Sequence, residues 1–205
     1  MTSKPQGNQD DEMNGLRMRP ALFICDIQER FRSTIFGYPE VVSTARRMIS
    51  AAGILQLPLY VTTQSRAKLG PTVNELDVSK AVVNTDKTRF SMMVPEIAQN
   101  LKKGTPVAIV GIESHVCVLQ TTLDLLKAGH PVYLLADGIS SANKEEKPIA
   151  LRRLAQAGAT VTTSESFLFE TMGDASVDQF RQISSLIKNE KTETQKSLDT
   201  LASRL

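Results

Sequence analysis

The middle of the chain alternates short apolar runs with longer stretches in which apolar residues recur at three- and four-residue spacing. The short runs predict strands and the longer stretches predict helices. The expected strands are residues 21–25, 57–62, 81–83, 106–110, 131–135 and 159–162. The expected helices lie near residues 39–52, 95–102, 114–128, 149–155, 165–172 and 177–188. Strands separated by helices are typical of a parallel sheet covered on both faces, so we expect one α/β domain with a six-stranded parallel sheet.

Polar segments flank this predicted core. Residues 1–19 lack the apolar stretch of a secretory signal, and their acidic residues argue against a mitochondrial presequence. We expect them to form a disordered N-terminal tail. The chain after Lys188 is polar again, so we expect the domain to span residues 20–188 and a fraying polar C-terminal tail to follow at 189–205.

Composition narrows the classes of function. A chain of 205 residues with 41% hydrophobic and 22% charged residues is ordinary for one globular domain. A net charge of +2 gives no nucleic-acid footprint, and no apolar run approaches the roughly 20 residues of a membrane span. Two cysteines and two histidines make neither a disulfide scaffold nor a zinc cluster. We expect a protein of a reducing compartment, cytoplasmic or, as an open alternative, mitochondrial, that binds neither membrane nor nucleic acid.

Chemistry is expected where the parallel strands end, because ligands bind at the carboxyl edge of such sheets. Asp26 ends the first strand, Lys87 lies just beyond the third, and Cys117 lies in the first turn of the helix expected after the fourth. Each alone has an ordinary interpretation: a turn aspartate, a solvated loop lysine and an inert core thiol. Their convergence on one predicted edge favours a shared site.

A thiol attacks a carbonyl group as its thiolate, and a helix N-terminus with a nearby ammonium favours that form. Cys117 has the first and Lys87 could supply the second. Asp26 could accept the thiol proton and later activate a water molecule. Backbone N–H groups at the start of the same helix could bind the developing oxyanion.

Three stretches in this order resemble the isochorismatase-like cysteine hydrolase family: residues 23–31 (FICDIQERF), 87–91 (KTRFS) and 111–118 (GIESHVCV). The resemblance runs from about residue 20 to about residue 188. Residues 163–175 look more specifically like the isochorismatase domain-containing protein 2 subgroup. The three stretches together are specific, whereas any one of them alone would not be.

The resemblance implies a three-layer αβα fold with strand order 3-2-1-4-5-6 and an Asp26-Lys87-Cys117 catalytic triad. It implies hydrolysis of a small amide or related carbonyl compound through a thioester, at C–N bonds other than peptide bonds. It also implies a cis peptide bond that maps to Ile112–Glu113, with the N–H groups of Val116 and Cys117 aimed at the oxyanion. Members of the family form dimers or larger oligomers, so a homo-oligomer is expected.

Two departures from the family pattern bear on the substrate. The nicotinamidase branch carries a metal-binding Asp-x-His after its second strand, and residues 61–65 here contain no histidine. We therefore expect no metal and no cofactor, and nicotinamide is disfavoured as the substrate. Glu113 and His115 stand where other branches have a small and an acidic residue.

Four side chains are candidates for the substrate pocket: Gln28, Phe31, Phe90 and His115. Aromatic residues at such places are more often core, and a histidine at a helix start is at least as often structural. Cys25 would face away from Asp26 in an alternating strand, so we assign it to the core.

Three rival interpretations stay open. The fold could serve as a non-catalytic metabolite-binding or protein-interaction module. Cys117 could have a thiol-redox role, which is weaker because no second cysteine is expected nearby. Nucleic-acid hydrolysis ranks low, because no basic patch or metal set supports it.

Overall fold

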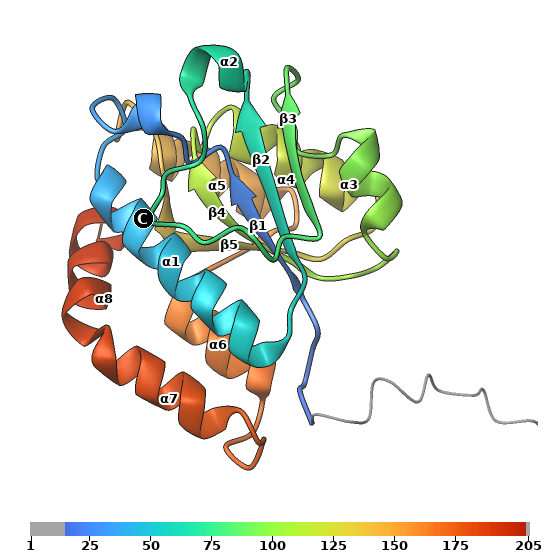
Figure 1. Ribbon diagram of the computed structural model, residues 1–205, viewed down its shortest axis with the longest axis vertical. Helices are drawn as coiled ribbons and strands as arrows, with labels where there is room; N and C mark the ends of the chain where they lie inside the picture. The colour runs from blue at the N-terminus through green and yellow to red at the C-terminus, as the bar shows by residue number, and fades with distance from the viewer. Residues whose placement is uncertain (1–14, 204–205) are drawn as a thin grey trace, which may run out of the picture.

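The computed structural model describes residues 15–203, and its centre is a six-stranded sheet in the order β3-β2-β1-β4-β5-β6 (Figure 1). Every neighbouring pair is parallel. The strands are β1 (Ala21–Cys25), β2 (Leu59–Gln64), β3 (Val83–Lys87), β4 (Val107–Ile112), β5 (Val132–Ser140) and β6 (Thr160–Thr162). The predicted α/β class and strand order are therefore confirmed.

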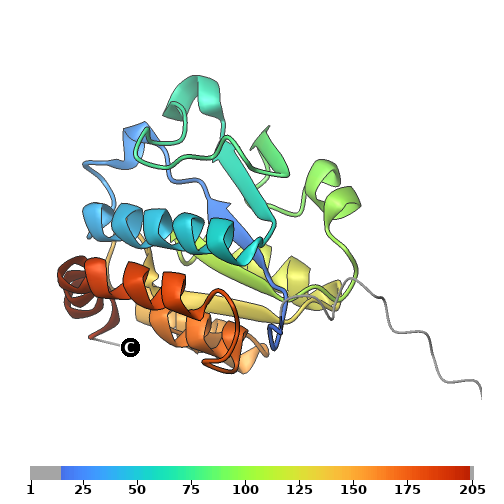
Figure 2. The same cartoon turned by 60° about the horizontal axis from the view of Figure 1, so that its bottom comes forward.

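Helices cover both faces of the sheet, and Figure 2 shows α1 and α7 side by side on one of them. This face carries α1 (Tyr38–Leu55), α6 (Ser164–Met172), α7 (Phe180–Asn189) and α8 (Lys191–Ser197), which continues into the π-helical turn η2 (Leu198–Ala202). The other face carries α3 (Pro95–Asn100), α4 (Cys117–Lys127) and α5 (Glu146–Gln156). The short η1 (Glu29–Phe31) and α2 (Arg66–Leu69) follow β1 and β2. No helix in the described part of the chain is long and apolar enough to cross a lipid bilayer.

The residues of β1 divide between the two halves of the core. Leu22 and Ile24 pack with the α1 layer, whereas Phe23 and Cys25 pack with the α4 layer. All five residues of the strand are buried, which explains its continuous apolar sequence. Because Cys25 faces the α4 layer, it lies on the same side of the sheet as Cys117.

The strands reach farther toward the carboxyl edge than the apolar runs predict. β3 was expected at residues 81–83 but spans Val83–Lys87. It is an edge strand whose residues alternate between exposed and partly buried positions, so most of it is polar. Lys87 is consequently the last residue of the strand rather than part of a loop beyond it, and its side chain is buried.

The expected fraying tail at residues 189–205 is helical over its described part. Although its composition is polar, one side of it packs against the domain, where Thr194, Ser197 and Leu201 are buried. Lys147 of α5 also donates from Nζ to the backbone oxygens of Ala136 and Leu201, which holds η2 to the sheet. The prediction of a loose C-terminal tail was therefore wrong for residues 189–203.

The expected N-terminal tail lies mostly outside the described residues. Its described part, residues 15–19, is attached to the domain rather than free. Leu16 and Met18 pack against the core, and the Arg17 N–H donates to the Thr171 oxygen at 3.0 Å.

A glycine allows β1 and β4 to approach at the edge that carries Asp26. Gly111 pairs with Cys25 across the two strands. A Cβ atom at position 111 would lie 2.4 Å from the Cys25 oxygen and 2.5 Å from the Cys25 Cβ, distances that no side chain tolerates. The sheet therefore requires glycine at this position to keep these strand ends together.

Candidate active site

The carboxyl ends of β1 and β3 bring a carboxylate and an ammonium into contact. Asp26 directly follows β1, and its Oδ2 lies 2.7 Å from the Nζ of Lys87. Both side chains are at most 1% exposed. Thr62 of β2 donates to the other carboxylate oxygen at 2.8 Å. Three neighbouring strands thus hold a buried ion pair at the edge where the sequence predicted chemistry.

The pKa of Lys87 is raised, although its burial alone would lower it. The negative charges that Cys25, Asp26 and Cys117 carry when ionised oppose the effect of burial and outweigh it. Since a lysine with a raised pKa stays protonated at neutral pH, the site contains a fixed positive charge. Cys117 is one of the groups whose charge acts on Lys87, and it packs in the same core cluster as Cys25, whose Sγ lies 3.8 Å from the Asp26 Oδ2.

Cys117 is the first residue of α4 and is 6% exposed. Among the described residues, neither its backbone N–H nor that of His115 donates a backbone hydrogen bond. These N–H groups are free to donate to an oxygen beside the thiol. The start of a helix also favours negative charge at this place.

The oxyanion loop differs from the expected one in two respects. The described residues contain no cis peptide bond, so the expected cis bond at Ile112–Glu113 is wrong. The loop turns instead at Glu113, which has a left-handed φ of 56°. The Val116 N–H donates to the Glu113 oxygen at 3.0 Å and is therefore not available to an oxyanion.

Cys25 was assigned to the core facing away from Asp26, and this orientation is wrong. Alternation breaks after β1 because Asp26 has a left-handed φ of 55°, and the Cys25 Sγ lies 3.8 Å from the Asp26 Oδ2. Hydrogen bonding with the Cys117 thiol, followed by burial and the Asp26 charge, raises the pKa of Cys25. Cys25 therefore stays a neutral thiol beside Cys117.

A serine cluster holds the loop before Cys117. The Ser141 Oγ accepts from the Ser114 N–H at 2.9 Å and lies 3.2 Å from the His115 Nδ1. The same ring nitrogen lies 3.4 Å from the Glu113 Oε2. His115 and Glu113 are 30% and 19% exposed, so this pair forms a polar border of the site.

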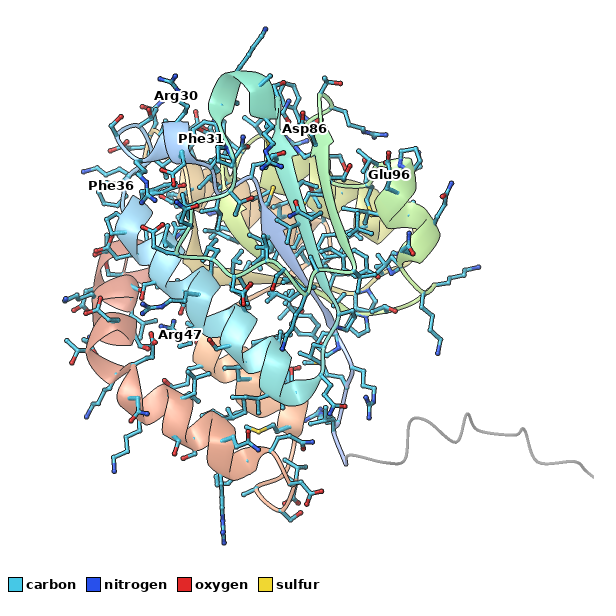
Figure 3. All side chains as sticks on the ribbon, in the orientation of Figure 1. Arg30, Phe31, Phe36, Arg47, Asp86 and Glu96 are labelled. Carbon is cyan, nitrogen blue, oxygen red and sulfur yellow. The ribbon has the colours of Figure 1, made fainter. Side chains whose placement is uncertain are left out.

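The remaining pocket candidates differ in burial and in their contacts with the site. Gln28 is fully buried, and its amide is used up by backbone groups of Gln64 and Gly70, so it supports a loop instead of facing a substrate. Phe31 and the exposed Phe36 lie at the end toward which the strands point (Figure 3). Phe90 is 47% exposed, and only its backbone oxygen touches the ion pair, at 2.9 Å from the Lys87 Nζ.

Sequence reasoning missed two side chains that support the ion pair. Thr62 binds Asp26, and Gln64 Oε1 accepts from Lys87 at 2.8 Å. Their position at the end of the second strand was a usable signal, because all parallel strands end at one edge.

Within residues 15–203, no group of three or more His, Cys, Asp or Glu side chains is placed to hold a metal ion. The donors at the carboxyl edge are instead occupied by one another, as the contacts of Asp26 show.

Comparisons of this sequence with a family model and with related proteins identify the same family. The isochorismatase domain model matches residues 20–166. The secreted isochorismatase effector Isc1 of Phytophthora sojae is 43% identical over 187 residues, covering 87% of this chain and 89% of the relative. Human isochorismatase domain-containing protein 2 is 42% identical over 170 residues, 82% of each chain.

A solved structure agrees with these relatives. The structure titled MAR1 ribonuclease from Caenorhabditis elegans superimposes with a TM-score of 0.80 at 42% identity, covering 86% of this chain and 92% of that one. The predicted resemblance is thus confirmed. The chain belongs to the isochorismatase domain family.

Proposed function

We propose that this protein is a cysteine hydrolase that cleaves a small amide or related carbonyl compound through a thioester on Cys117. The observation that carries the proposal is the buried Asp26–Lys87 ion pair beside a thiol at a helix N-terminus. Family membership makes hydrolase chemistry plausible. The arrangement joins a base, a fixed cation and a nucleophile in one place.

In the first half-reaction, Asp26 accepts the Cys117 proton and the thiolate adds to the substrate carbonyl carbon. The carbonyl oxygen becomes an oxyanion, to which the free N–H groups of Cys117 and His115 donate. The tetrahedral adduct then collapses: the C–N bond breaks, and the departing amine takes the proton from Asp26. An acyl thioester on Cys117 remains.

In the second half-reaction, Asp26 accepts a proton from water while the water oxygen adds to the thioester carbon. Collapse of this adduct breaks the C–S bond, releases the carboxylic acid and returns the proton to the thiol. The balance is one amide and one water converted to one acid and one amine. Lys87 contributes its charge and donates no proton in either half.

Turnover of a panel of small primary amides, from acetamide to benzamide, tests the proposal. We expect Cys117→Ala to lower kcat/KM by at least about 10³-fold, since removing a nucleophile abolishes the covalent route. Acid quenching followed by intact-mass measurement should show an acyl adduct, and peptide mapping should place it on Cys117. Cys25→Ser serves as the labelling control, because it removes the only other thiol in the sequence.

Two results would contradict the mechanism. One is unchanged turnover in Cys117→Ala. The other is iodoacetamide labelling of Cys117 that is as slow near neutral pH as that of an ordinary thiol, which would favour the non-catalytic binding module. A sulfenic acid on Cys117 after mild peroxide, without amide turnover, would favour the redox role.

Ribonuclease activity is the second candidate, because the Caenorhabditis elegans structure carries that name at 42% identity. We disfavour it for this chain because the net charge is only +2 and the buried Lys87 has no proton to offer a phosphate. Incubation with a single-stranded RNA should give no cleavage. Cleavage lost in Cys117→Ala would instead reassign the same site to RNA.

The proposed substrate is a small molecule, and the proposed cellular location is a reducing compartment such as the cytoplasm. The mechanism needs Cys117 as a free thiol, and both cysteines are free. The Phytophthora relative is named a secreted protein, so relatives differ in location. Assembly into dimers or larger oligomers stays a prediction.

A further inference from the structure

All three protons of the Lys87 ammonium have acceptors inside the protein. They are the Asp26 Oδ2 at 2.7 Å, the Gln64 Oε1 at 2.8 Å and the Phe90 backbone oxygen at 2.9 Å. Only one of these acceptors carries a charge. The lysine therefore has no proton left for a substrate, and its position is fixed from three directions.

The amide of Gln64 is held so that its oxygen faces Lys87. Its Nε2 donates to the Thr88 backbone oxygen at 2.8 Å, which turns the Oε1 toward the ammonium. Gln28 fixes the backbone of the same residue: its Oε1 accepts from the Gln64 N–H at 2.6 Å and its Nε2 donates to the Gln64 oxygen at 3.1 Å. One glutamine thus positions a second, and the second positions the lysine.

The neutrality of Gln64 has an electrostatic consequence. The titratable groups that face Lys87 are Cys25, Asp26 and Cys117, and each is negative when ionised. A carboxylate in place of the Gln64 amide would cancel part of the lysine charge that acts on Cys117. An apolar side chain would leave one ammonium proton without an acceptor in a buried place.

We propose that Gln64 is a positioning residue, a neutral acceptor that fixes Lys87 as an ammonium whose charge acts on the Cys117 thiolate. This inference rests on the proposed function, because it requires Cys117 to react as a thiolate. Gln64, the last residue of β2, then has a role besides pairing with the neighbouring strand. Gln64 itself need not touch the substrate.

The rate of Cys117 alkylation by iodoacetamide, followed from pH 5.5 to 9.5 by intact mass, tests this without a substrate. We expect a wild-type midpoint below about pH 7.5. Gln64→Met, which keeps the shape but removes the acceptor, should raise the midpoint by about 0.5–1 pH unit. Gln64→Glu, which keeps an acceptor but adds a charge, should raise it by more than about 1 unit.

Thr63→Val is the matched control. Thr63 precedes Gln64 on the same strand and donates to Asp86 at 2.8 Å, outside the ion pair. This variant should keep the wild-type midpoint while losing a comparable hydrogen bond. Thermal unfolding of all variants establishes that they fold, and Gln64→Glu provides the readout even if Gln64→Met does not fold.

The outcomes separate the two proposals. A low wild-type midpoint that stays in place in folded Gln64 variants overturns the role of Gln64 and leaves the hydrolase proposal standing. A wild-type midpoint near the ordinary thiol value of about 8.5 overturns both. Upward shifts in the Gln64 variants, absent from Thr63→Val, support the positioning role.

Discussion

The protein contains two buried pairs of a cation and a carboxylate, and they differ in what surrounds them. Lys87–Asp26 lies at the carboxyl edge of the sheet, and Arg47–Asp137 joins α1 to β5 at 3.2 Å. Figure 3 shows Arg47 on α1, away from the edge that carries Phe31. Ser164 closes the second pair by donating to both Asp137 oxygens, at 2.7 and 2.5 Å. Asp26 instead faces a thiol.

The electrostatic behaviour of the two cations differs in the same way. Burial lowers the pKa of Arg47, and the opposing effect of the Asp137 charge is too small to restore it. Lys87 has several neighbours that can become negative, so its pKa is raised. The Arg47–Asp137 pair connects three elements of the fold through Ser164, although the Arg47 Nη1 is buried without a hydrogen-bond partner. The Lys87–Asp26 pair contacts the Cys25 thiol and interacts with the charge of Cys117, the nucleophile of the proposed reaction. We therefore expect loss of the Arg47–Asp137 pair to lower stability and loss of the Lys87–Asp26 pair to lower activity.

The largest expected effect is the difference between substituting Asp137 and substituting Asp26. Asp137→Asn leaves a guanidinium that cannot lose its proton buried without a counter-charge, which should cost about 3–5 kcal/mol of unfolding free energy. Asp26→Asn should cost clearly less, because Lys87 can become neutral, but should lower kcat/KM at least about 100-fold. Urea unfolding and amide turnover measure the two effects. Equal stability losses would contradict the distinction.

The pH dependence of the unfolding free energy tests how burial affects another cation of the fold, Lys147. Burial, only partly offset by the Asp137 charge, lowers the pKa of Lys147 to about 7. An unfolded lysine titrates near about 10.4, so above pH 7 the unfolded chain binds more protons than the folded one. The stability contribution of Lys147 should therefore be lowest below pH 7 and rise with pH from there toward 10.

Comparison with Lys147→Met isolates this contribution. The free energy of unfolding of the wild type, minus that of the variant, should increase from pH 6 to pH 9. Its slope should approach about 1.4 kcal/mol per pH unit above pH 7. Urea unfolding at four pH values provides the measurement. A difference that is flat with pH would mean that the Lys147 amine keeps its charge inside the fold.

The smallest expected effect belongs to an exposed pair near the site. Arg89 lies two residues after Lys87 and pairs with Asp124 at 3.0 Å, with side chains 56% and 38% exposed. Arg89→Gln should change the unfolding free energy by less than about 1 kcal/mol and leave the alkylation rate of Cys117 within about twofold. A larger change in either would show that this pair is coupled to the buried one.

Much of the fold was predictable because buried strands have continuous apolar sequences. β1 was predicted to the residue, since all five of its side chains are apolar and buried. The start of β3 was misplaced because an edge strand exposes polar residues. Asp26 and Lys87 were placed at one edge by a general property of parallel sheets, which needs no knowledge of side-chain conformation.

Side-chain directions beyond the strand ends were not predictable. Asp26 and Glu113 both adopt left-handed backbone conformations that few non-glycine residues take, and no local pattern announces them. The expected alternation of side chains along the strand therefore gave the wrong orientation of Cys25 relative to Asp26. The hydrogen bonds of Gln64 were equally hidden, because they connect residues more than twenty positions apart.

The absence of a side chain at position 111 sets a rule for engineering this protein. Any library that aims at new substrates can vary Glu113 and His115, which are partly exposed and border the site. The same library must keep Gly111, because a single added carbon would collide with Cys25 and separate the strands that deliver the acid and the thiol. The position that tolerates no side chain, near the end of β4, thus lies two residues before a position that can be varied, in the loop that follows.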